Sequence, residues 1–123
     1  AGKEHQQLIK QTFEEGGKCL FAEKKQLDII SALTSSGIAF ALKYIHAAMQ
    51  AGIEMGVYPK DAMRMVAQSV KGAAELILNN DTHPSVEIDK VCTPGGITIK
   101  GINELEHDGY TSAIINAIKA SKQ

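Results

Sequence analysis

Residues 38 to 55 read IAFALKYIHAAMQAGIEM, and their pattern decides the fold. The polar residues Lys43, His46, Gln50 and Glu54 recur at spacings of three and four, which is the spacing of one narrow stripe on a helix. Nearly every other residue in the stretch is apolar. The stretch therefore predicts a helix that must be covered on most of its circumference.

The following stretch, residues 60 to 78, repeats this arrangement. Pro59 occupies a plausible first-turn position, where its missing N–H costs nothing. One line of the helix is polar, and the rest carries methionine and branched aliphatic residues. The polar line comprises Asp61, Arg64, Gln68, Lys71 and Glu75, and the apolar residues include Met63, Met65, Val66, Val70, Leu76 and Ile77. A chain of 123 residues is too small to surround two such helices, because small domains bury only about two thirds of their chain surface. We therefore expect a second chain to cover them, as a homodimer.

Working outward, most of the remaining chain also has helical character. Leu27, Ile30 and Leu33 recur at three-residue steps, and the polar TSSG at 34 to 37 is expected to end that helix and cap the next. Further helices are expected at 85 to 91, 98 to 107 and 111 to 121, with Gly109 as a stop between the last two. The sequence thus predicts an all-α helical bundle that is covered by a second chain.

The first 23 residues differ from the rest. Residues 4 to 15 have helical character, and KCLFAE at 18 to 23 reads as a short strand. A single strand has no sheet to join in a helical chain and is not stable alone. We therefore expect these residues to be the end of a preceding α/β domain.

Composition excludes several classes of function. The 13 Lys and Arg balance 14 Asp and Glu without clustering, so a nucleic-acid or anionic-membrane surface is not expected. The longest apolar run, at 37 to 42, is far shorter than the roughly 20 residues that span a bilayer. Two cysteines in a chain of this size suit a reducing compartment, and we expect a cytoplasmic protein. The histidines show no metal-ligand spacing, so no metal site is expected.

Residues 92 to 98, CTPGGIT, interrupt the helical pattern. Glycines at 95 and 96 allow backbone angles closed to other residues and close approach by another molecule. The helix that begins after them offers unpaired amides and the positive end of its dipole, beside the hydroxyls of Thr93 and Thr98. These features could bind a carboxylate, and residues 93 to 98 are called the cradle below. The motif alone is also that of a simple turn followed by a cap, and turns are the commonest use of these residues.

The ordered series of elements resembles the C-terminal domain of pyrroline-5-carboxylate reductase. The likeness runs from about Glu23 to Ser121, through ALTSSGIAFALKYIHAAMQAGIEMGVYPKDAMRMVAQSVKGAAELIL (32 to 78) and HPSVEIDKVCTPGGITIKGINELEHDGYTSAIINAIKAS (83 to 121). That family usually has Thr-Ser-Pro-Gly-Gly-Thr-Thr where this chain has Cys92 to Thr98, and Ser-Gly-Ser-Gly-Pro-Ala-Tyr where it has Thr34 to Phe40. Ile97 thus replaces a threonine, and Ile38 replaces a proline.

The resemblance implies roles for the cradle. By this resemblance, the substrate carboxylate is bound by Thr93, Gly95, Gly96 and Ile97. Thr98 is the implied catalytic residue and hydrogen-bonds the imine nitrogen. Ser36 and Gly37 are implied to lie near the cofactor. Residues 1 to 23 would end a Rossmann cofactor domain, and residues 24 to 123 would form the dimerisation and substrate domain.

The implied reaction is reduction of 1-pyrroline-5-carboxylate to L-proline by NADPH or NADH, the last step of proline biosynthesis. No G-x-G-x-x-G occurs in this chain, so the cofactor would be bound by residues outside it, and the chain alone is expected to be inactive. The resemblance also implies a dimer in which the helical bundles of two chains interleave, and some family members form larger rings of dimers. Two alternatives stay open: a reductase acting on another cyclic imino acid, and a helical dimerisation module without catalytic function.

Overall fold

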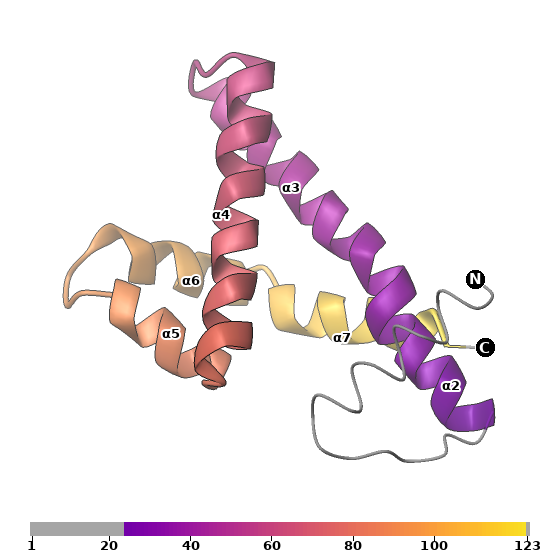
Figure 1. Ribbon diagram of the computed structural model, residues 1–123. Coiled ribbons are helices and arrows are strands. Elements are labelled where there is room, and N and C mark those ends of the chain that lie inside the picture. Colours follow the sequence, from indigo (N-terminus) through magenta and orange to yellow (C-terminus); the bar gives the residue numbers. More distant parts are fainter. Residues whose placement is uncertain (1–23, 123) are drawn as a thin grey trace. The chain divides into compact units, whose positions relative to one another are not determined.

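The computed structural model describes residues 24 to 122, which form helices joined by short turns (Figure 1). No strand occurs among these residues, so the all-α prediction is confirmed. The elements are α2 (Lys24–Ser31), the π-helical turn η1 (Ala32–Ser36), α3 (Gly37–Glu54), α4 (Pro59–Asn80), α5 (Pro84–Val91), α6 (Ile97–His107) and α7 (Tyr110–Ala120). The helix and strand expected at 4 to 15 and 18 to 23 lie outside the described residues.

The chain divides into two compact units. The described part of the first comprises residues 24 to 41 and 113 to 122, and the second comprises residues 42 to 112. Each is described by itself.

In the first unit, the boundary predicted at 34 to 37 is wrong. The chain passes from α2 through the π-helical turn η1 into α3 without leaving a helical conformation, and Gly37 has right-handed helical angles (φ −57°, ψ −33°). The Thr34 hydroxyl donates to the Ile30 carbonyl oxygen at 2.8 Å instead of capping a new helix. Hydroxyl residues can bond back to the preceding turn in this way, so their presence does not require a helix end.

Because α2, η1 and α3 follow one another without a break, they form one long helical stretch. The 29-residue stretch Gln26–Glu54 is long and apolar enough to cross a membrane, which the short apolar run at 37 to 42 did not suggest. The same length and composition also occur in core helices that are covered by protein. One such helix is weak support for a membrane span.

In the second unit, α3 and α4 meet in a tight hairpin at residues 55 to 58 (Figure 1). Gly56 has a positive φ of 106°, its amide donates to the Ile53 oxygen, and the Val57 amide donates to the Gly52 oxygen. This is a Schellman C-cap. A Cβ atom at Gly52 would lie 3.5 Å from the Ala62 Cβ, so the two helices approach closely there.

The later helices also end on local signals. Asp81 ends α4 in the left-handed conformation (φ 51°, ψ 43°), and its amide donates to the Ile77 oxygen. His83 caps α5 by accepting from the Ser85 amide at 3.1 Å. Gly109, with φ of 81°, separates α6 from α7, as predicted. The predicted bounds of these helices agree with the structure to within two residues.

Burial inside each unit is slight. Among the described residues only Ala32 and Ala62 are buried, while many large apolar side chains are exposed. On α3 and α4 and their hairpin the exposed ones are Ile38, Leu42, Tyr44, Ile53, Met55, Tyr58, Met63, Met65, Leu76 and Leu78. The predicted polar lines are exposed as well. The polar and the apolar faces of α3 and α4 are thus both exposed in a single chain, as expected of a subunit that needs a partner.

Candidate functional site

The cradle begins with a β-turn between α5 and α6. The Gly96 amide donates to the Thr93 carbonyl oxygen at 2.9 Å, which closes a turn with Pro94 and Gly95 at its centre. Gly95 has φ of 72°, a left-handed conformation. Proline followed by a residue of positive φ is the signature of a type II turn, and glycine is the residue that adopts it without strain. The expectation of an unusual backbone angle is therefore confirmed at Gly95.

Gly96 is required for a different reason than the sequence suggested. Its angles (φ −76°, ψ 174°) are extended and open to any residue. A Cβ atom there would overlap the Thr93 Oγ1 atom and would lie 3.0 Å from the Thr93 carbonyl oxygen. The turn folds back so tightly on Gly96 that no side chain fits.

The N-terminus of α6 follows directly. Gly96 is its N-cap, and no side chain caps the helix. The first amides of a helix have no carbonyl partner within it. Because the Gly96 amide is already used by Thr93, the donors left at this end are those of Ile97, Thr98 and Ile99. The Ile97 side chain is 85% exposed and so does not obstruct them.

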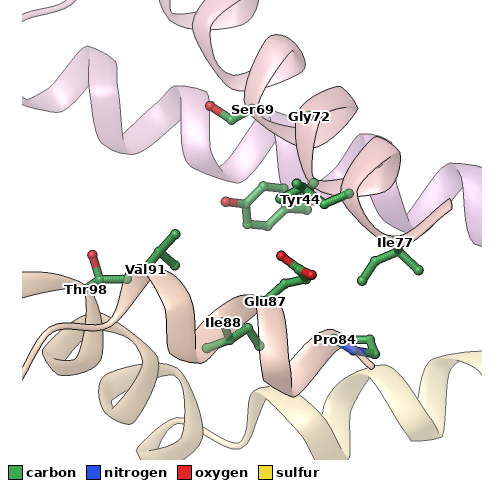
Figure 2. A pocket seen from close by; sticks show the side chains of 11 residues that line it. Tyr44, Ser69, Gly72, Ile77, Pro84, Glu87, Ile88, Val91 and Thr98 are labelled. Carbon is green, nitrogen blue, oxygen red and sulfur yellow. The ribbon is translucent and has the colours of Figure 1, made fainter. Parts of the chain in front are cut away.

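Thr98 also lines a groove within the second unit (Figure 2). The groove has a volume of about 860 Å³, and its wall is mostly apolar. Its lining comes from α3 (Tyr44), α4 (Ser69, Gly72, Ala73, Leu76, Ile77), α5 (Pro84, Glu87, Ile88, Val91) and α6 (Thr98). Figure 2 shows Val91 and Thr98 at one end and Glu87 directed into the space beneath the Tyr44 ring.

Glu87 was not expected from the sequence. Its side chain is only 10% exposed, and its Oε2 atom accepts from the Thr82 hydroxyl at 2.5 Å and from Lys90 Nζ at 3.3 Å. The Thr82 hydrogen bond is the largest effect holding the pKa of Glu87 below its usual value; burial opposes it, and Lys90 adds to it. The signal that could have found it is an acidic residue in the first turn of a short helix, near a threonine in the preceding linker.

The remaining predicted site residues lie in the first unit. Ser36 ends η1 and Gly37 begins α3, and both are half-buried. Among residues 24 to 122, no three His, Cys, Asp or Glu side chains gather where they could hold a metal ion.

Comparisons with known proteins confirm the resemblance to pyrroline-5-carboxylate reductase. Residues 24–123 match the family model described as pyrroline-5-carboxylate reductase dimerisation. The chain is 44% identical over 115 residues to pyrroline-5-carboxylate reductase 1 of Dictyostelium discoideum, covering 94% of this chain and 21% of that protein. It is 42% identical over 117 residues to reductase 2 of the same organism, covering 95% of this chain and 39% of the relative.

Solved structures give the same result. A Streptococcus pyogenes 1-pyrroline-5-carboxylate reductase matches with a TM-score of 0.79 at 30% identity, covering 98% of this chain and 47% of that one. A Plasmodium falciparum pyrroline carboxylate reductase with NADP bound matches with a TM-score of 0.78 at 25% identity, covering 98% and 46%. The chain therefore spans less than half the length of these relatives. It belongs to the pyrroline-5-carboxylate reductase dimerisation family.

Proposed function

We propose that this chain is the dimerisation and substrate-binding part of a reductase that converts 1-pyrroline-5-carboxylate to L-proline with NADPH or NADH. Its family, and the names of its relatives, support this reaction. The Plasmodium relative binds NADP, and a reduced nicotinamide would supply the hydride. This chain has no glycine-rich phosphate motif, so the cofactor would be bound mainly by residues outside it.

The observation that carries the proposal is the uncapped N-terminus of α6 behind the turn at Gly95. Amides at a helix N-terminus and the helix dipole favour a carboxylate. In the proposed site, the amides of Ile97 and Thr98 and the Thr93 hydroxyl bind the substrate carboxylate. Gly95 and Gly96 shape the turn and keep side chains away from it. The Thr98 hydroxyl would hydrogen-bond the imine nitrogen and so orient it. Because a threonine hydroxyl is a poor acid, it is not expected to protonate the imine.

The dimer is part of the same proposal. The apolar surfaces of α3 and α4 are too extensive to face water in a stable single chain. A second copy would cover them, and dimers could assemble further into rings. Residues 24 to 123 would form this dimerising domain, with residues 1 to 23 ending a cofactor domain. A cytoplasmic location remains a prediction from the sequence.

The test compares Thr98→Val and Thr98→Ser in the longest product of the gene. One hydrogen bond contributes roughly 0.5–1.5 kcal/mol, so we expect Thr98→Val to lower kcat/KM by about 2- to 10-fold. Thr98→Ser should retain most activity because it keeps the hydroxyl. Equal turnover by all three proteins would show that Thr98 does not contact the imine.

The alternatives give different results in the same assay. A reductase for another imino acid would turn over a six-membered cyclic imine faster than the five-membered one. A module without catalytic function would reduce neither. It would also bind no proline when the 123-residue chain is titrated and followed by NMR at Gly95 to Thr98.

A further inference from the structure

The joint between α4 and α5 is held together by one carboxylate. Glu87 accepts from Thr82 in the linker and from Lys90 one turn further along α5. The carboxylate thus connects the linker that follows α4 with α5. Lys90 is 60% exposed, whereas the Thr82 hydrogen bond is partly buried.

The side chain of Glu87 is largely shielded from water, although the residue as a whole is only partly buried. Glu87 faces the groove that Leu76, Ile77, Ile88 and Val91 also line (Figure 2). Removing a carboxylate from water costs free energy, and apolar residues often replace buried charges without loss of stability. Apolar contacts tolerate sliding, however, whereas the 2.5 Å hydrogen bond to Thr82 forms only in one geometry. Glu87 is therefore suited to fixing the orientation of α5.

The orientation of α5 determines the position of the cradle. An isolated helix of eight residues is not stable in water, so α5 depends on its contacts. From Glu87 to Cys92, the C-cap of α5 and the residue before the cradle, the chain rises by about 7.5 Å along the helix axis. A tilt of about 10° would then move the turn by about 1.3 Å. A shift of this size would change the distances between the cradle amides and a carboxylate that they bind.

We propose that Glu87 is a positioning residue for the cradle: bound by Thr82, it holds α5 so that the turn at 93 to 96 and the first amides of α6 stay in binding geometry. The expected effect of Glu87 on substrate binding rests on the proposed function. Its effect on the cradle itself can be measured without any substrate.

The test uses Glu87→Leu and Thr82→Val, with Thr82→Ser as the conservative variant that keeps the hydroxyl. Glu75→Leu is the matched control, because Glu75 pairs with Lys71 at 3.9 Å in the same way but is 56% exposed. In the 123-residue chain, we expect amide hydrogen exchange at Gly96 to be at least about fivefold faster in Glu87→Leu and Thr82→Val. Thr82→Ser and Glu75→Leu should exchange like the wild type.

In the longest gene product, Glu87→Leu and Thr82→Val should raise KM for the imino acid about tenfold and change kcat less than about twofold. Unchanged exchange at Gly96 in either variant overturns the inference, as does an equal change in Glu75→Leu. If Glu87→Leu does not fold, Thr82→Val decides the matter. A wild type that reduces no imino acid overturns the proposed function, and hydrogen exchange then tests Glu87 alone.

Discussion

Gly96→Ala tests the geometry of the cradle directly. The added Cβ would overlap the Thr93 hydroxyl oxygen and approach the Thr93 carbonyl oxygen to 3.0 Å. The hydroxyl can rotate away, but the carbonyl oxygen belongs to the main chain. It also accepts the 2.9 Å hydrogen bond from the Gly96 amide that closes the turn. Alanine must therefore displace the turn rather than one side chain.

The size of the effect follows from two contributions. Forcing an extra methyl group into a packed site costs about 1–3 kcal/mol. Stretching the turn's hydrogen bond costs up to about 1 kcal/mol more. We expect Gly96→Ala to lower the free energy of unfolding by about 2 kcal/mol, which corresponds to roughly 30-fold more frequent opening of the turn.

The assay is urea denaturation at fixed protomer concentration, with hydrogen exchange at residues 95 to 99 as the local measurement. Gly101→Ala is the control, because Gly101 lies inside α6 with no atom within 4 Å of its added Cβ. Alanine is favoured over glycine in a helix by roughly 0.5–1 kcal/mol, so this variant should be more stable than the wild type. The reasoning would be refuted if the two variants shifted stability in the same direction.

Three further outcomes are expected. Thr34→Val should destabilise the chain by roughly 0.5–1.5 kcal/mol through loss of the hydrogen bond to Ile30, with Thr34→Ser closer to the wild type in calorimetry. The pKa of Glu87 is lowered in the fold, chiefly by Thr82, so its contribution to stability is present above about pH 4.5 and is lost as the pH falls below that. Urea midpoints of the wild type and Glu87→Gln should therefore converge in acid; a constant difference would contradict this. Asp81→Gly should raise Tm, because glycine removes the left-handed strain of roughly 1 kcal/mol, and a lower Tm would assign Asp81 a stabilising contact.

Most helix boundaries could be predicted because they depend on local chemistry. Pro59 and Gly109 act through their own backbone restrictions, so each marks its boundary wherever the surrounding helices lie. The polar lines of α3 and α4 are equally readable, since helical spacing alone places them on one face. The all-α class follows from these features.

The misreadings have a common cause. The hydroxyl at Thr34 suits a helix end, but it also suits a bond to the preceding turn, and the sequence does not distinguish the two. Both glycines at 95 and 96 were expected to allow unusual backbone angles and close approach by another molecule, but Gly96 is needed for the close approach of Thr93 of its own chain, which only the folded structure reveals. Glu87 was missed because its burial depends on how α5 lies against α4.

Within the cradle, the chain departs from the family pattern at a position that the proposed site tolerates. Ile97 replaces a threonine, but its side chain is 85% exposed and its amide keeps its place in the first turn of α6. Carboxylate binding would rest on main-chain donors, which are the same for every residue type except proline. Discrimination between ring sizes would then come from side chains, and we expect the Thr98 side chain, which lines the groove, to contribute to it. Exchanging Ile97 for threonine should leave the preference between five- and six-membered imino acids unchanged, and a reversed preference would assign the discrimination to the side chain at position 97.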